Sequence, residues 1–347
     1  MNLRQRIAAH SANPGAVTAV LAVMLPLCIF LSLALGPVPI PLSGIVSELA
    51  GRHTLEPTLH VILFSLRLPH ILATAVIGAA LGVAGMLFQG LFRNPLADPY
   101  VIGSSSGSLV GAAIAIFWFP AATFYGFASS ALFAFLGAAL TIGLVYLIAQ
   151  SGTDGSSNSL LLAGFAIGTM LTGAAYLLET FSSDSSAGLR AMSAWLHGTI
   201  ATPAWPQLGV IVAMLGVGVF LSWLLTHRLN ALAFGDEYAA QLGIPLERTR
   251  AAVIVVGALL TAAAVSLGGI IGFVGLIVPH VMRMLMGPDN RSLLPACALG
   301  GAMLVVVADI FARTLIAPSE LPVGILMAFL GGPFFLFLLR RRPEVYA

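Results

Sequence analysis

Long apolar stretches follow one another along this chain from Ala16 to Leu339, with only short polar breaks between them. Most have roughly the 20 residues that an apolar helix needs to cross a bilayer. Charged residues make up 8% of the sequence, whereas soluble proteins carry about 25%. Because the apolar residues are continuous and do not alternate with polar ones, helices are favoured over a barrel. The sequence therefore predicts an all-α polytopic membrane protein, a compact bundle forming a single domain over residues 1–347.

The hydrophobic pattern predicts ten membrane-spanning helices in this chain. They are expected near residues 16–36, 59–90, 100–120, 124–149, 158–180, 206–226, 250–270, 272–286, 292–313 and 322–340. The second is longer than a bilayer requires, so it must tilt or project from the membrane. The eighth is short and contains Pro279. Such a broken helix is tolerated only where protein or a cavity covers its freed backbone groups.

The chain has no lysine, and its fifteen arginines are divided unevenly between the predicted loops. With the N-terminus in the cytoplasm, the inner ends receive eleven: Arg4, Arg6, Arg93, Arg228, Arg248, Arg250, Arg283, Arg291, Arg340, Arg341 and Arg342. The outer ends receive four: Arg52, Arg67, Arg190 and Arg313. Since cytoplasmic loops carry the excess of cations, both termini are predicted to be cytoplasmic. The first apolar stretch has no clear small-residue cleavage site, so it is interpreted as a retained helix and not as a signal peptide.

Small residues and one ionisable pair indicate how the spans pack. Gly78, Gly82 and Gly85 follow one another at helical spacing in the second span. Such faces let helix backbones approach closely in a membrane. Asp309 lies four residues before Arg313 in the ninth span, so the two side chains share a helix face and can pair. We interpret Asp309 as a structural partner of Arg313, with a proton relay as the alternative.

Several catalytic signatures are missing from the sequence. Without lysine, a phosphate-binding GxxxxGK[ST] loop cannot exist, so this chain cannot hydrolyse ATP by that route. The HExxH, CxxC and GxSxG motifs are absent as well. The seven histidines are scattered, and Cys28 and Cys297 lie in different apolar spans, which predicts no disulfide. We therefore assign no catalytic residue, no metal ligand and no bound cofactor to this chain.

The most informative polar segment connects the sixth and seventh spans. Asp236 and Glu237 suit a helix N-terminus, where the dipole favours negative charge, and Gly243 suits a C-terminal cap. Pro245 suits the first turn of a second short helix. The pattern predicts two short helices over residues 234–250 on the inner face. We interpret them as a docking element, with a solvated connecting loop as the alternative.

Five segments together resemble a known family. They are RLPH at 67–70, FRNPLADPYVIGSSSG at 92–107, GDEYAAQLGIP at 235–245, GGIIGFVGLIVPH at 268–280 and ELPVG at 320–324. In this order they are similar to the FecCD-type permeases, which are subunits of type II ABC importers for ferric siderophores, haem and cobalamin. The resemblance implies a homodimer in the membrane lipid, two separate ATPase subunits that use ATP and Mg inside, and a periplasmic substrate-binding protein outside. It implies no nucleic-acid partner.

The resemblance also assigns roles at the inner face. The residues that match the ATPase-coupling helix are Asp236, Glu237, Tyr238, Ala239, Ala240, Leu242 and Gly243. Asn94 and Leu96 match residues of a cytoplasmic gate. Ser151–Ser159 takes the place of the other gate loop, without a residue-level match.

At the outer face, Arg67 and Arg313 match arginines that meet acidic residues of the binding protein. His70 stands where close relatives often place a second arginine, so docking could be weaker or depend on pH. Arg190 lies where some haem-importing members carry an arginine able to meet a propionate. A plain surface arginine is the alternative for Arg190.

We therefore expect a permease subunit in the bacterial inner membrane, part of an ATP-driven importer that moves haem or a ferric siderophore from periplasm to cytoplasm. A cobalamin importer of the same family is the alternative. A secondary transporter or channel is the rival from another class. The scarcity of buried carboxylates disfavours that rival, and the docking element at 235–250 distinguishes the two.

Overall fold

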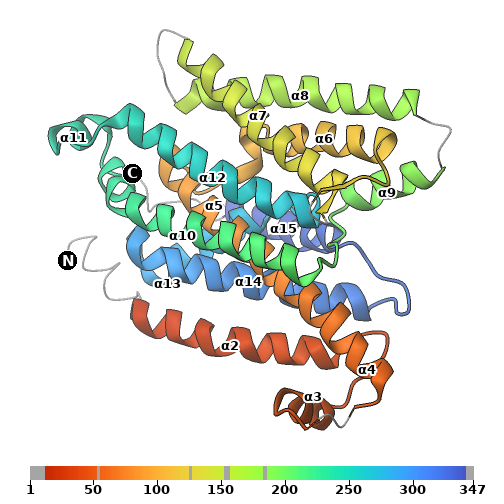
Figure 1. The fold of residues 1–347 in the computed structure, drawn as a ribbon. Coiled ribbons are helices and arrows are strands. Elements are labelled where there is room, and N and C mark those ends of the chain that lie inside the picture. The colour runs from red at the N-terminus through yellow and green to blue at the C-terminus, as the bar shows by residue number, and fades with distance from the viewer. Residues whose placement is uncertain (1–11, 53–54, 125–126, 152–156, 183–185, 341–347) are drawn as a thin grey trace.

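A computed structural model of the chain describes residues 12–52, 55–124, 127–151, 157–182 and 186–340, and Figure 1 shows a bundle of roughly aligned helices. The elements are α2 (Pro14–Ala34), α3 (Leu42–Leu49), α4 (Pro57–Val61), the π-helix η1 (Ile62–Arg67), α5 (Leu68–Phe92), the 3₁₀ helix η2 (Pro99–Ile102), α6 (Ser104–Trp118), β1 (Thr123–Phe124), β2 (Phe127–Ala128), α7 (Ser129–Ser151), α8 (Ser157–Phe181), α9 (Ser186–Leu196), α10 (Trp205–Leu232), α11 (Asp236–Gln241), α12 (Leu246–Gly268), α13 (Val274–Met286), α14 (Asn290–Thr314) and α15 (Val323–Arg340).

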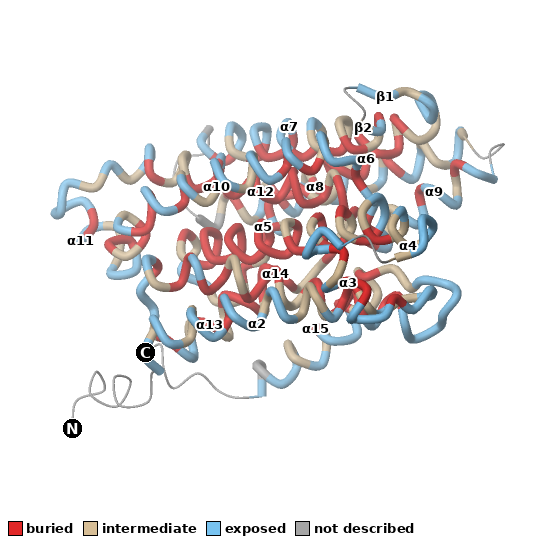
Figure 2. Tube along the Cα trace, turned by 60° about the horizontal axis from the view of Figure 1, so that its bottom comes forward, coloured by how far each residue is buried: buried red, intermediate tan, exposed pale blue. Residues whose placement is uncertain are grey.

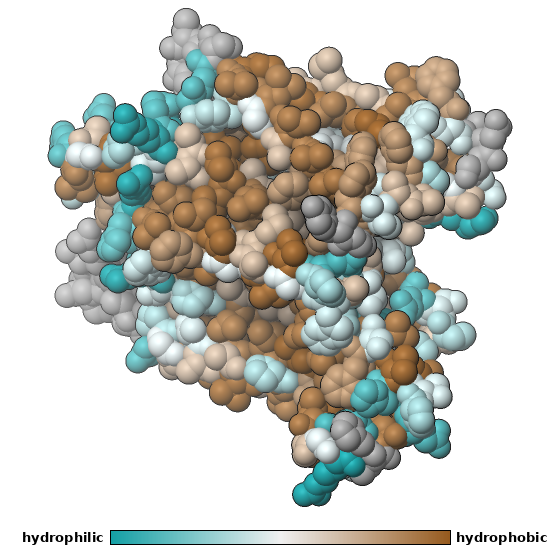
Figure 3. All heavy atoms as spheres, in the orientation of Figure 1, coloured by the Kyte–Doolittle hydropathy of each residue, from teal (hydrophilic) through white to brown (hydrophobic). Residues whose placement is uncertain are grey.

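Each of the ten predicted spans coincides with one apolar helix of this bundle. Among the described residues, seven helices are long and apolar enough to cross a membrane, and α6, α13 and α15 are shorter apolar helices. The predicted long second span is the continuous run α4–η1–α5, 36 residues from Pro57 to Phe92. In Figure 3 apolar side chains cover most of the middle of the visible face, and hydrophilic residues gather toward the ends of the bundle. The expected helical membrane fold is confirmed.

Helix α5 forms the centre of the bundle because its small residues admit neighbours on several sides. Figure 2 shows it buried along most of its length, with α14, α12, α10 and α13 packed around it. A Cβ atom added to Gly78 would lie 2.2 Å from the carbonyl oxygen of Gly301, and one added to Gly82 would lie 2.3 Å from that of Cys297. Helices α5 and α14 therefore touch through their backbones, as the glycine spacing predicted.

The broken eighth span is α13, and a side chain from α5 covers the backbone groups that the break frees. Pro279 has no N–H, so the carbonyl of Gly275 loses its helical partner. The amide of Gln89, buried in α5, donates to the carbonyls of Gly275 and Leu276 at 3.3 and 3.1 Å. Arg283 in turn donates to Gln89 Oε1 at 2.7 Å. Protein therefore satisfies this break, which is the condition under which a membrane tolerates it.

Several elements differ from the predictions. The segment 100–103 belongs to η2 and a turn, and a β1–β2 hairpin pairing Thr123 with Ala128 precedes α7. The two non-spanning helices α3 and α9 were not predicted. The expectation of a second short helix after Pro245 was wrong, because α12 begins at Leu246 and continues for 23 residues as a spanning helix. Pro245 is its N-cap residue and not part of its first turn.

Candidate functional sites at the two ends of the bundle

Helix α11 projects from one end of the bundle, which we call the α11 end (Figure 1). The acidic first turn is present at Asp236 and Glu237, and Gly243 adopts φ +77° at the turn after the helix, as predicted. Phe234, Tyr238 and Leu242 are exposed by 67%, 49% and 57%. Phe234 lies in the turn before α11 and Leu242 is its C-cap residue, and the rings of Phe234 and Tyr238 are 5.5 Å apart.

The opposite face of α11 packs inward through Ala239. This residue is fully buried and belongs to the main hydrophobic core, and its N–H donates to the carbonyl of Gly235. Ala239 therefore cannot meet a partner chain, although it lies among the residues matched to the coupling helix. The exposed residues of that set include Glu237, Tyr238, Ala240 and Leu242.

Asp236 joins α11 to two other segments of the α11 end. Its carboxylate lies 3.3 Å from Arg93 Nη2 and 2.7 Å from Arg250 Nη2. Arg93 directly follows α5 and has φ +50°, a conformation uncommon outside glycine. The predicted coupling helix and the turn that carries the predicted gate residues Asn94 and Leu96 are thus adjacent in space. Their contact could not be predicted from the sequence, because Arg93 and Asp236 are 143 residues apart in the chain.

The predicted gate segment at residues 93–98 is a compact turn between α5 and η2. Asn94 Oδ1 accepts a hydrogen bond from Leu96 N at 2.9 Å, and Asp98 Oδ1 accepts one from Tyr100 N at 2.8 Å. Burial raises the pKa of the Asp98 carboxyl to about 6, although the Tyr100 hydrogen bond acts in the opposite direction. Asn94 is exposed and Leu96 half-buried. Their role as a gate stays a prediction, and most of the second gate loop, 152–156, lies outside the described residues.

The arginines separate between the two ends. The described arginines that lie near helix termini at the α11 end are Arg93, Arg228, Arg248, Arg250, Arg283, Arg291 and Arg340. A hydrogen bond from Ala12 N to Leu285 O joins the start of α2 to the end of α13 at this end. A second, from Asn290 to Asn230, joins the start of α14 to the end of α10. Arg4, Arg6, Arg341 and Arg342 lie outside the described residues.

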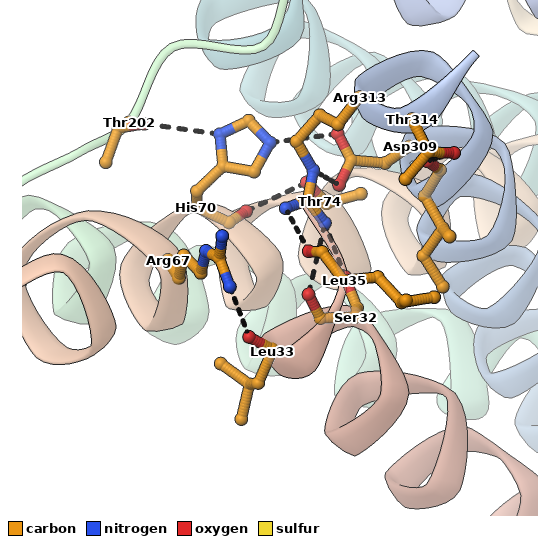
Figure 4. A network of polar contacts seen from close by, with 11 residues as sticks. Ser32, Leu33, Leu35, Arg67, His70, Thr74, Thr202, Asp309, Arg313 and Thr314 are labelled. Atoms are coloured by element: carbon orange, nitrogen blue, oxygen red, sulfur yellow. Dashed lines mark hydrogen bonds and ion pairs between the residues drawn. The ribbon is translucent and has the colours of Figure 1, made fainter. Parts of the chain in front are cut away.

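The opposite end, which we call the α3 end, contains a buried polar network that centres on Asp309 (Figure 4). Arg313 Nε donates to Asp309 Oδ2 at 2.8 Å, so the predicted pair is confirmed. His70 Nε2 lies 2.9 Å from Asp309 Oδ1, and its Nδ1 lies 3.2 Å from Thr202 Oγ1. Asp309 thus has two cationic or donor partners inside the bundle, which suits a structural role.

Arg67 and Arg313 also bind the C-terminal end of α2. Arg67 donates to the carbonyls of Leu33, at 2.7 Å, and Val38, while Arg313 donates to Ser32 Oγ at 2.6 Å and to the Leu35 carbonyl at 3.3 Å. The last carbonyls of a helix have no partners within it, and its negative dipole end favours cations. Arg67 is 7% exposed and Arg313 is 6% exposed. Their binding to an external protein stays a prediction.

A cavity of about 290 Å³ opens beside this network. Its lining includes Arg67, His70, Thr202, Arg313 and Glu320. A larger opening of about 600 Å³ lies between α6 and α8, where Ser106, Thr172 and Tyr176 are among the lining residues. Neither space could be predicted from local sequence, because segments far apart in the chain line each of them.

Arg190 is exposed on α9, which lies toward the α3 end (Figure 1). Gly188 and Met192 form the buried face of this helix. An exposed cation with small neighbours is compatible with both interpretations of Arg190, a ligand contact or a surface residue. Within the described part of the chain, no group of three or more His, Cys, Asp or Glu residues could hold a metal ion.

Comparison with known proteins assigns the chain to a family. The sequence profile described as the FecCD transport family matches residues 24–341. The chain belongs to this family. It is 42% identical to the hemin transport system permease protein HmuU of Yersinia pestis, over 81% of this chain and 83% of that protein. It is 39% identical to the cobalamin import system permease protein BtuC of Halobacterium salinarum, over 88% of this chain and 81% of that protein.

A solved structure has the same fold. An inward-facing metal-chelate type ABC transporter aligns with a TM-score of 0.82 and 31% identity, covering 94% of this chain and 99% of that chain. This FecCD protein is thus a multi-pass membrane permease of an ABC importer. Permeases of ABC importers associate with ATPase subunits and a substrate-binding protein.

Proposed function

We propose that this permease forms a homodimer in the lipid of the bacterial inner membrane and imports an iron complex, haem or a ferric siderophore. Two ATPase subunits on the cytoplasmic side hydrolyse ATP with Mg, and a periplasmic protein delivers the cargo. Uptake then runs from periplasm to cytoplasm.

The observation that carries the proposal is the exposed face of α11. Phe234, Tyr238 and Leu242 form an apolar and aromatic strip at the end of the bundle where arginines collect. Aromatic residues are enriched in protein interfaces. Because the strip projects past the ends of the spanning helices, we do not expect lipid to cover it. An ATPase subunit is a partner that fits this position.

The orientation follows from the same end. Seven described arginines lie near helix termini at the α11 end, whereas Arg52, Arg67, Arg190 and Arg313 belong to the α3 end. The end with the excess of cations is expected to be cytoplasmic. This orientation places both termini and the ATPase subunits inside, and the binding protein at the α3 end.

The iron-complex cargo rests on the relatives. The hemin permease shares 42% identity over most of both chains, and the solved structure with 31% identity is of metal-chelate type. The identity of 39% with a cobalamin permease supports cobalamin as the second candidate. Arg190 would serve a haem cargo, because a guanidinium can hold a propionate through two parallel hydrogen bonds.

The experiment is uptake by the purified importer, reconstituted in vesicles with its ATPase and binding-protein partners. Haem, a ferric siderophore and cobalamin are compared with and without ATP. We expect ATP-dependent uptake of haem or the siderophore. Faster uptake of cobalamin would select the second candidate, and equal uptake of the cargo without ATP would overturn the importer itself.

A further inference from the structure

Three of the four large apolar residues of helix α3 point away from the protein. Leu42, Val46 and Leu49 are exposed by 49%, 54% and 58%. At 3.6 residues per turn, positions i, i+4 and i+7 share one face. The inward face instead carries Ile45 and Glu48, exposed by 0% and 4%.

The contacts of the inward face fix this orientation. Glu48 Oε1 accepts a hydrogen bond from Leu55 N at 2.8 Å, and Glu48 Oε2 lies 3.8 Å from His60 Nε2. A Cβ atom added to Gly44 would lie 2.4 Å from Leu55 Cδ2, so Leu55 packs directly on this glycine. Ile45 belongs to the hydrophobic cluster of the α3 end. The helix therefore cannot rotate to bury Leu42, Val46 and Leu49 without breaking these contacts.

The exposed apolar residues of α2 are followed along the chain by those of α3. Helix α2 is a span whose most apolar stretch is 17% buried. Its exposed apolar residues are Val20, Val23, Met24, Leu27, Leu31 and Leu35. Val38, exposed by 43%, then leads to Leu42. Figure 1 shows α3 on the outside of the bundle, beside the last turns of α2.

The polar residues of α3 occupy a different side of the helix. Ser43 is exposed and Ser47 is half-buried. They follow Leu42 and Val46 by one residue each, about 100° around the helix. Arg52 is exposed just past the helix, and its N–H donates to the carbonyl of Ser47. An apolar side, a neighbouring side with serines and an arginine just past the helix suit a helix that lies in the plane of the membrane interface.

We propose that α3 is a membrane-interface anchor, with Leu42, Val46 and Leu49 inserted among phospholipid acyl chains. Ser43 faces water and Arg52 reaches the headgroups. The anchor would hold the segment that follows α2, whose Val38 carbonyl accepts a hydrogen bond from Arg67. This proposal requires only that the chain spans a membrane, and it is independent of the cargo and of which end faces the cytoplasm.

The test is spin-label accessibility in the full permease, reconstituted in phosphatidylethanolamine–phosphatidylglycerol vesicles. Cys28 and Cys297 are first replaced by alanine, and nitroxide labels are then attached to Val46→Cys, Ser43→Cys and Val23→Cys. Oxygen concentrates in acyl chains, whereas a water-soluble nickel chelate does not enter them. The oxygen-to-nickel collision ratio should exceed one at position 46, as at the lipid-facing control 23, and should fall below one at position 43.

Two results would overturn the anchor. A ratio below one at position 46 means that the face is in water. Shielding of position 46 from both reagents means that protein covers it, either a second copy or the binding protein. If the cysteine-free background does not yield folded protein, Val46→Trp in the native chain gives a second measurement. Its added fluorescence should be quenched by acyl-brominated lipids, and absence of quenching would also exclude the anchor.

Discussion

Replacing Gly85 by alanine should separate two helices at the centre of the permease. A Cβ atom at Gly85 would lie 1.9 Å from the carbonyl oxygen of Gly275 and 2.5 Å from its Cα. These are backbone atoms, which cannot rotate away. Since ordinary contact begins at 3.4 Å, α13 must move from α5 by about 1.5 Å, the difference between 3.4 and 1.9 Å.

The size of the effect follows from what that movement breaks. Overpacking of a well-packed site costs about 1–3 kcal/mol. The shift also lengthens the bonds that Gln89, one turn after Gly85, donates to Gly275 and Leu276, and each is worth about 1 kcal/mol. Alanine gains about 1 kcal/mol over glycine in helix propensity. We therefore expect the free energy of unfolding to fall by about 3 kcal/mol.

A matched control lies in α10. A Cβ atom at Gly216 meets nothing within 4 Å, so Gly216→Ala should keep only the propensity gain and raise stability by up to about 1 kcal/mol. The assay is unfolding of the purified permease in mixed micelles titrated with SDS. Equal stability of Gly85→Ala and the wild type would refute the reasoning, and so would an equal loss in both variants.

The remaining predictions concern the two ends. Leu242→Asp should abolish ATP-driven uptake while the protein still folds, because it puts a charge on the exposed face of α11, whereas Ala239→Arg should lower the yield of folded protein. Size-exclusion chromatography measures folding and an uptake assay measures transport. Normal uptake by Leu242→Asp would contradict the docking face. Arg67→Glu combined with Arg313→Glu should strongly weaken binding-protein affinity in a pull-down, and an unchanged affinity in correctly folded protein would remove the docking role. Arg190→Ala should reduce haem uptake without changing basal ATP hydrolysis or the affinity for the binding protein. Arg190→Lys should restore uptake only in part, because an ammonium lacks the planar fork of donors of a guanidinium. Full haem uptake by Arg190→Ala would show that Arg190 is a plain surface residue.

Much of the fold could be predicted from local sequence because the bilayer imposes a length and a solvent on each helix. The ten apolar stretches match ten helices, and the Gly78–Gly82 spacing identified the face on which α5 and α14 touch through their backbones. The non-spanning helices α3 and α9 were missed because they are short and amphipathic. The second coupling helix was misplaced because Pro245 suits both an N-cap and a first turn, and the apolar run that begins at Leu246 decides for a span.

The site was less predictable because its contacts join distant segments. Spacing alone revealed the Asp309–Arg313 pair, since the residues share a helix turn. It could not reveal His70, which reaches Asp309 from a position 239 residues earlier. Within α11, Ala239 follows Tyr238 by one residue, about 100° around the helix, so an exposed Tyr238 was a usable signal that Ala239 lies on another face.

The burial of Arg67 and Arg313 limits how they could bind an external protein. A guanidinium has five N–H donors, and the Nε, Nη1 and Nη2 of Arg313 all bind groups of its own chain. An acidic residue of a binding protein must therefore share or displace the carbonyls at the end of α2. Removing one partner of a buried pair costs about 3–5 kcal/mol, whereas close interfacial charge pairs contribute about 1.5–7 kcal/mol. Docking at Arg313 can thus be strong only if the end of α2 keeps its position, because the Ser32 hydroxyl and the Leu35 carbonyl hold the guanidinium in place.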